Sequence, residues 1–93
     1  MARFQDSETR AENLPRLGSI IRSRRRASGL RIDDAAALCG VSVDLLSRLE
    51  NGKSGVSTDR LLKVLDGLGL ALAVIDKSPV ASGAKTPLKP GEE

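Results

Sequence analysis

The hydrophobic pattern divides most of the chain into four predicted helices. Apolar side chains recur at intervals of three and four positions, which is the spacing of one helix face. The predicted helices span residues 14–28, 32–39, 43–51 and 58–68, and a glycine directly follows each of them. Glycine is typical of helix ends because it enters the left-handed conformation without steric cost. In the last helix the side chains predicted to face inward are those of Leu61, Leu62, Leu65 and Leu68.

After the fourth helix, in GLGLALAVIDK, the pattern changes to the alternation of a β-strand, predicted over residues 70–76. A lone strand cannot satisfy its own backbone hydrogen-bonding groups, and the sequence predicts no second strand. We therefore expect this strand to pair with the same strand of a second copy in a homodimer. The predicted dimerisation residues are Leu70, Leu72, Val74 and Ile75. The alternative is that the segment folds back on the fourth helix as an irregular tail.

The two ends of the chain are polar. Residues 1–13 show no periodicity and are predicted to form a flexible arm, and residues 77–93 are rich in Pro, Gly and Ser and are predicted to be disordered. The helices then form one domain, residues 14–69, followed by the dimerisation strand. No long apolar run indicates a signal peptide or a membrane span, so we expect a cytoplasmic protein without membrane association.

The composition restricts the classes of function. The 93 residues include one Phe, no Trp, no Tyr and no His, and the one cysteine is Cys39. A small core without aromatic bulk provides little net stability, which favours oligomerisation. A chain without histidine or clustered carboxylates lacks the usual groups for acid–base and metal chemistry. The sequence therefore argues against an enzyme and predicts no cofactor and no metal site.

The second and third predicted helices, with the turn between them, meet the steric requirements of a helix-turn-helix. Ala36 supplies the small side chain where the two helices approach closely, and Gly40 begins the turn. The positions that must be apolar carry Ala35, Cys39, Val41, Leu46 and Leu49. The alternative is a small helical bundle whose glycines only end helices. The combined matches favour the helix-turn-helix.

The distribution of charge supports a nucleic-acid partner. The net charge is +3, and residues 14–31 contain six arginines and no acidic residue. Such a patch neutralises DNA phosphates and releases their counterions, although a solvated helix face has the same composition. The predicted phosphate contacts are Arg22, Arg26, Arg31, Asn51, Lys53 and Ser54.

The second helix of such a motif enters the major groove of double-stranded DNA with its N-terminal residues toward the base edges. The predicted base contacts are Ser42, Val43, Asp44, Ser47 and Arg48. Arg48 has the donors for guanine O6 and N7, Asp44 can accept from cytosine N4, and Val43 can contact a thymine methyl group. Asp44 has an equally good structural explanation, because an acid in the first turn of a helix is favourable without DNA.

The run LGSIIRSRRRASGLRIDDAAALCGVSVDLLSRLENGK resembles the Xre/Cro-type helix-turn-helix family over about residues 16–69, and LSRLENGK is its most specific piece. The resemblance implies a mainly α fold, here a four-helix domain like that of lambda repressor. It also implies a structural ion pair between Arg25 and Glu50. Members of the family often begin the second helix with a phosphate-binding Gln, where this chain has Ile32.

The C-terminal run TDRLLKVLDGLGLALAVID is similar to the HipB-type antitoxins. This resemblance implies an antiparallel two-stranded sheet between the subunits of a homodimer and a HipA-like serine/threonine kinase toxin as partner. The leading hypothesis is a dimeric repressor of its own operon that binds a palindromic operator, lies on the nucleoid when DNA-bound, and acts as an antitoxin. The alternatives are a stand-alone Xre regulator and a protein-only adaptor.

Overall fold

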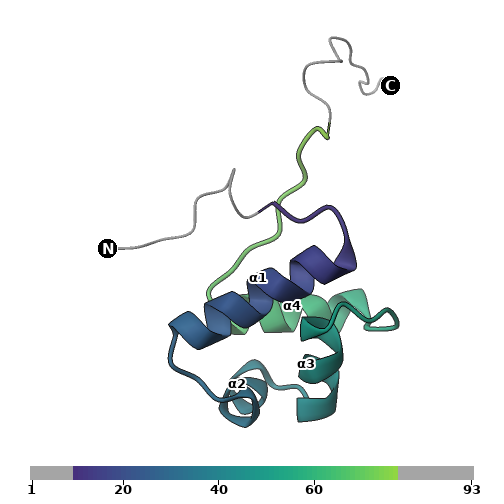
Figure 1. The fold of residues 1–93 in the computed structure, drawn as a ribbon. Coiled ribbons are helices and arrows are strands. Elements are labelled where there is room, and N and C mark those ends of the chain that lie inside the picture. Colours follow the sequence, from purple (N-terminus) through teal and green to yellow (C-terminus); the bar gives the residue numbers. More distant parts are fainter. Residues whose placement is uncertain (1–9, 78–93) are drawn as a thin grey trace.

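Four α-helices make up the folded part of the chain in a computed structural model that describes residues 10–77. The helices are α1 (Leu14–Ala27), α2 (Ile32–Cys39), α3 (Val43–Glu50) and α4 (Thr58–Gly67). In Figure 1, α1 crosses in front of α4, and α2 and α3 lie below this pair of helices. Each predicted helix is present and ends within one residue of its predicted boundary, so the four-helix prediction is confirmed.

Local hydrogen bonds explain where three of these helices begin. The side chain of Ser42 accepts from the backbone N–H of Leu45 at 3.1 Å, as a capping residue should. Asn13 caps α1 by accepting from the N–H of Arg16 at 2.8 Å. Ser57 caps α4 in the same way. Because each cap satisfies a backbone donor that the helix itself leaves unpaired, these polar residues set the boundaries.

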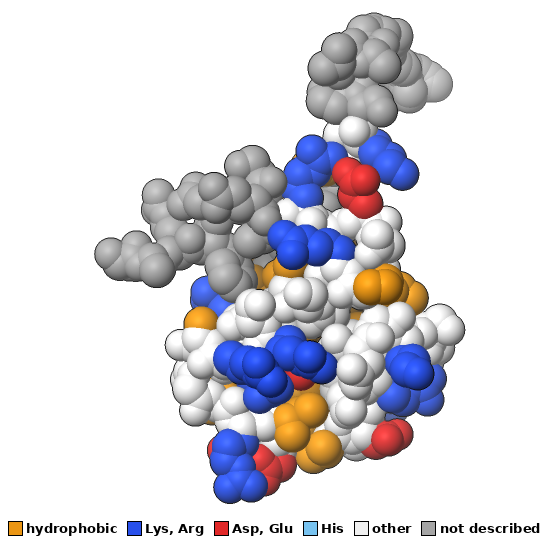
Figure 2. All heavy atoms as spheres, in the orientation of Figure 1, with side chains coloured by type: hydrophobic (Ala, Val, Ile, Leu, Met, Phe, Trp, Pro, Cys, Tyr) orange, Lys and Arg blue, Asp and Glu red, His pale blue; other side chains and the backbone are white. Residues whose placement is uncertain are grey.

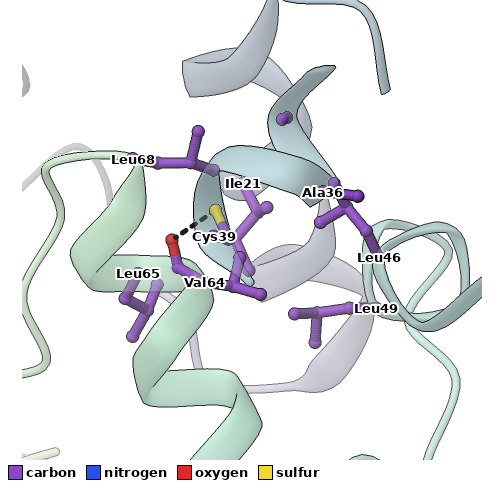
Figure 3. Packing of buried hydrophobic residues seen from close by; sticks show 9 residues of the cluster. Ile21, Ala36, Cys39, Leu46, Leu49, Val64, Leu65 and Leu68 are labelled. Carbon is purple, nitrogen blue, oxygen red and sulfur yellow. Dashed lines mark hydrogen bonds between the residues drawn. The ribbon is translucent and has the colours of Figure 1, made fainter. Parts of the chain in front are cut away.

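The core is aliphatic and lies where all four helices meet. The residues of its buried cluster are Ile21, Ala35, Ala36, Cys39, Leu46, Leu49, Val64, Leu65 and Leu68. Figure 3 shows these side chains converging from the four helices. Burial raises the pKa of the Cys39 thiol above its usual value, and its Sγ donates to the carbonyl oxygen of Val64 at 3.6 Å.

The prediction for the inward face of α4 is wrong at one residue. Leu62 is 44% exposed, whereas Val64 is fully buried. Leu61, Leu65 and Leu68 lie on the same side as Val64, at the i, i+3, i+4 and i+7 positions of one helix face. Leu62 lies one position further around the helix and is turned out of the core.

Gly18 permits α1 to approach α3 closely. A Cβ at this position would overlap the main-chain carbonyl oxygen of Leu49 and would lie 2.6 Å from that of Glu50. We expect Gly18→Ala to lower the free energy of unfolding by about 1–3 kcal/mol, because the overlap with backbone outweighs the better helix propensity of alanine. Urea denaturation measures this loss. Ser19→Ala on the exposed side of α1 is the control and should change stability by less than about 0.5 kcal/mol. A Gly18→Ala variant as stable as the native chain contradicts the close approach.

The segment after α4 is not a strand within this single chain. Residues 71–76 carry neither helix nor strand, and Figure 1 shows the segment leading past α1 and away from the helices. Leu70 packs against the core, but Leu72, Val74 and Ile75 are 58%, 96% and 55% exposed. A strand needs a partner and this chain alone supplies none among its described residues, so pairing with a second copy stays a prediction.

The predicted arm and tail fall largely outside the described residues, since these begin at Arg10 and end at Lys77. The described end of the arm is held by an exposed ion pair between Arg10 and Glu12 at 2.7 Å. The side chain of Arg16 also donates to the carbonyl oxygen of Arg10 at 3.2 Å. None of the helices between these ends is long and apolar enough to cross a membrane.

Candidate nucleic-acid interface

Helices α2 and α3 form a helix-turn-helix. Gly40 adopts the left-handed conformation that ends α2, with φ of 74°, and the N–H of Val41 donates to the carbonyl oxygen of Ala36 at 3.0 Å. Ala36 is 2% exposed, which leaves no room for a larger side chain between the helices. Ala35 on α2 and Leu46 on α3 are fully buried and belong to the same core cluster. The steric requirements read from the sequence are therefore met.

One side of α3 is exposed from its N-cap, Ser42, to its last turn, which contains Arg48. Ser42, Val43, Asp44 and Arg48 are exposed, and Ser47 is half-buried. Residues three and four positions apart share one helix face, so Asp44, Ser47 and Arg48 lie together on it. Five predicted base contacts thus gather at the beginning and on one side of α3, where hydroxyl, carboxylate, guanidinium and methyl groups reach outward.

Arg48 makes a contact that the sequence does not reveal. Its Nη2 donates to the carbonyl oxygen of Ser54 in the following loop, at 2.9 Å. Gly55 keeps this space open, because a Cβ there would lie 2.9 Å from the same Nη2. Since a guanidinium has five N–H donors, the contact leaves donors for a bidentate interaction while it restrains the direction of the side chain.

Arg25 and Glu50, the pair implied by the family resemblance, are in direct contact and nearly buried. Arg25 Nε lies 2.6 Å from Glu50 Oε2, and Arg25 Nη2 lies 2.9 Å from Oε1. A third donor, Nη1, reaches the carbonyl oxygen of Leu30 at 3.0 Å. The hydrogen bonds to Glu50 raise the pKa of Arg25, although burial acts in the opposite direction. This paired arrangement ties α1 to the end of α3 and compensates a carboxylate that would otherwise repel phosphates.

Arg22 and Asn51, two of the residues predicted to contact phosphates, are hydrogen-bonded to each other. Arg22 Nη2 donates to Asn51 Oδ1 at 3.2 Å, and Arg22 Nε lies 3.5 Å from Glu50 Oε1. The amide nitrogen of Asn51 donates to the carbonyl oxygen of Ser47 at 2.8 Å. The side chain of Arg22 is still 40% exposed. It therefore stands at the junction of α1 and α3 with part of its guanidinium facing solvent.

The remaining predicted phosphate contacts are all exposed. Arg26, Lys53 and Ser54 are exposed. Arg31 is also exposed, and its Nε lies 3.4 Å from Asp33 Oδ1 in an ion pair that the sequence did not predict. Figure 2 shows Lys and Arg side chains in several groups on one face, with the visible acidic side chains beside them. The face is thus basic, and acidic side chains neutralise part of its positive charge locally.

Gly52 has a role beyond the helix end that the sequence predicts for it. Its φ is +73°, and a Cβ there would lie 2.7 Å from the Cα of Pro15. The beginning of α1 and the loop after α3 are therefore packed backbone to backbone. The sequence signal was the glycine itself, but its spatial neighbour, Pro15, could not be identified from a local pattern.

Comparison with known proteins agrees with this geometry. The helix-turn-helix domain family matches residues 16–77. The chain belongs to the Xre-like helix-turn-helix family. An HTH-type transcriptional regulator of Sinorhizobium fredii, y4mF, is 30% identical to this chain over 59 residues. These residues are 63% of this chain and 78% of the regulator.

Two solved structures resemble this helix-turn-helix protein. The clp gene regulator ClgR from C. glutamicum is 36% identical, with a TM-score of 0.55, over 60% of this chain and 72% of that chain. The HipB chain of a HipA–HipB–O2–O3 complex has a TM-score of 0.67 at 20% identity, over 80% of this chain and 99% of that chain. At this identity the second likeness shows a shared fold.

Proposed function

We propose that this protein is a transcriptional repressor that binds a palindromic operator as a homodimer and acts as a HipB-like antitoxin of a HipA-like serine/threonine kinase. The observation that carries the DNA-binding part is the exposed face of α3 beside a basic junction. Ser42, Asp44 and Arg48 offer polar groups to base edges from this face. Major-groove readout uses such side chains of a recognition helix, and here they extend from the N-cap of α3 to Arg48 in its last turn.

Phosphate contacts would hold α3 in the groove from both sides. Arg22 and Arg26 belong to α1, and Lys53 and Ser54 follow α3 directly. Arg22 is held toward α3 by Asn51 at 3.2 Å, so a phosphate bound there would be fixed relative to the recognition helix. Because each neutralised phosphate releases counterions, we expect operator affinity to fall steeply with salt.

The homodimer is supported by the apolar segment after α4. Leu72, Val74 and Ile75 are large side chains more than half exposed in the single chain, and an unpaired apolar edge favours association with its own copy. Two-fold symmetry would close the pair of strands and place two recognition helices about 34–36 Å apart, one turn of DNA.

The antitoxin role is supported by the fold shared with HipB, which was solved in a HipA–HipB–O2–O3 complex. The test is co-purification of the protein with the product of the neighbouring gene, followed by footprinting on their shared promoter. Recovery of a kinase-like protein together with a protected symmetric site supports the whole proposal. Protection of a promoter without a bound partner protein contradicts the antitoxin part alone.

A stand-alone regulator is the second candidate. The observation that favours it is the 36% identity to ClgR, which exceeds the 20% identity to HipB. In this case the neighbouring reading frame encodes no kinase-like protein, and operator binding is unchanged when that frame is deleted.

Arg48→Ala separates base readout from phosphate contact. If Arg48 contacts a guanine, we expect operator affinity to fall by about 1–3 kcal/mol and one operator position to lose its preference. Lys53→Ala is the matched comparison, because loss of a phosphate contact weakens all sequences about equally and lowers the salt slope by about one. Titrations against single-base operator variants measure both effects. A uniform loss for Arg48→Ala assigns that side chain to a phosphate.

A further inference from the structure

One arginine of the basic run points to α4 instead of α3. Arg24 Nε donates to the carbonyl oxygen of Leu68, the residue that caps α4, at 2.8 Å. Arg22 and Arg25, on the same helix, reach Glu50 at the end of α3. Helix α1 therefore contacts the ends of two other helices through arginines only one or two positions apart.

A positive charge would stabilise the C-terminal end of α4, and the last turn of this helix supplies none. A helix C-terminus carries a partial negative charge, yet the last turn of α4 contains no basic residue and includes Asp66. Arg24 is a charged donor placed at this end by another helix. Its contact with the Leu68 carbonyl therefore stabilises α4 both as a hydrogen bond and by charge.

The backbone around Leu68 is arranged so that this carbonyl points to Arg24. The N–H of Gly69 donates to the carbonyl oxygen of Asp66 at 3.1 Å, and the N–H of Leu70 donates to that of Leu65 at 2.7 Å. These two bonds are the Schellman pattern, in which a left-handed residue turns the chain out of the helix. Gly69 has φ of +77°, and a Cβ there would lie 2.9 Å from Arg24 Nη2.

The contact lies at the root of the segment with the exposed apolar side chains. Arg24, Leu17 and Ile20 from α1 form one side of a groove of about 1070 Å³, and residues 69–75 form much of the other side. Leu70 is the last residue of this segment that packs on the core. Arg24 therefore contacts the chain at Leu68, two residues before the last core contact of the segment at Leu70.

We propose that Arg24 is a positioning residue that fixes the exit of residues 70–76 from α4 and so presents them for pairing with a second copy. This role rests on the proposed homodimer. It separates Arg24 from Arg22 and Arg26, for which we propose phosphate contacts. It also gives α1 a coupling function, because one helix holds both the recognition helix and the dimerisation segment.

Arg24→Ala is the test, with three readouts on the full chain. We expect amide hydrogen exchange at Gly69 and Leu70 to become about tenfold faster, and the dimer dissociation constant from sedimentation to rise about tenfold, because a charge-assisted hydrogen bond is lost. The salt slope of operator binding should stay unchanged. Arg24→Lys keeps the charge and should recover part of both losses, and Arg26→Ala should alter neither exchange nor dimerisation.

The readouts distinguish failure of this inference from failure of the proposed dimer. A lower salt slope for Arg24→Ala with unchanged exchange at Gly69 and Leu70 assigns Arg24 to a phosphate and overturns the positioning role. Faster exchange with unchanged dimerisation overturns it as well. In that case the direction in which residues 70–76 leave α4 does not determine how they pair with a second copy. A native chain that is monomeric at all concentrations contradicts the homodimer itself, and with it a positioning role for Arg24.

Discussion

Glu50→Ala is expected to lose about 3–5 kcal/mol of unfolding free energy, because it leaves the charge of Arg25 buried without its partner. Arg25 is 9% exposed and Glu50 is 5% exposed, and two short hydrogen bonds join them. Among the described residues, the carbonyl oxygen of Leu30, 3.0 Å from Arg25 Nη1, is then the one acceptor that Arg25 keeps. Urea denaturation followed by circular dichroism measures the loss, which is a large share of the stability of a small domain.

Two further variants show whether the stability loss comes from leaving a buried charge unpaired or from losing any ion pair. Arg25→Met combined with Glu50→Leu should recover much of the stability, since no buried charge is left unpaired. Asp33→Ala removes the exposed ion pair with Arg31 and should cost less than about 1 kcal/mol. A Glu50→Ala variant that loses no more than Asp33→Ala contradicts a structural role for the buried pair.

Val74→Pro is expected to weaken dimerisation and to lower operator affinity by about 10²–10⁴-fold, because a monomer loses the gain from binding two half-sites at once. Proline cannot donate a backbone hydrogen bond to a paired strand. Val74 is 96% exposed in the single chain, so the fold of the domain should be unaffected. Sedimentation gives the oligomeric state and mobility shifts give the affinity, while an unchanged urea midpoint shows that the helices are intact.

The neighbouring position provides the control for this variant. Backbone N–H groups of successive strand residues point to opposite sides, so Ala73→Pro removes a donor that faces away from the partner if Val74 faces it. We expect Leu72→Pro to behave like Val74→Pro and Ala73→Pro to be milder. A Val74→Pro variant that remains dimeric shows that the interface lies elsewhere.

Local signals in the sequence were sufficient to predict the helices and their ends. Capping by Ser42 and the left-handed turn at Gly40 depend on residues a few positions apart, and such patterns are visible in one dimension. The exposed face of α3 followed from the same helical period. By contrast, Leu62 and Val64 are both apolar, and the helical period that includes Leu61, Leu65 and Leu68 places Val64, not Leu62, on the buried face.

The direction of each arginine could not be predicted from the basic run. Arg22, Arg24 and Arg25 are chemically the same, but one reaches Asn51, one the Leu68 carbonyl and one a buried Glu50. These partners lie 25 to 44 residues away in the chain. The family resemblance indicated the contact between Arg25 and Glu50, and nothing in the sequence indicated the others. Whether residues 70–76 form a strand depends on pairing with a second molecule, which the sequence of one chain does not describe.

Selection of DNA duplexes from a random-sequence pool at physiological salt shows whether α3 reads the sequence of an operator. We expect enrichment of a two-fold symmetric site whose half-site centres are about 34–36 Å apart. We also expect Arg48→Ala to relax the preference for one base pair in each half-site. Recovery of unrelated duplexes without a shared sequence, bound equally by the native chain and Arg48→Ala, would contradict sequence readout by α3.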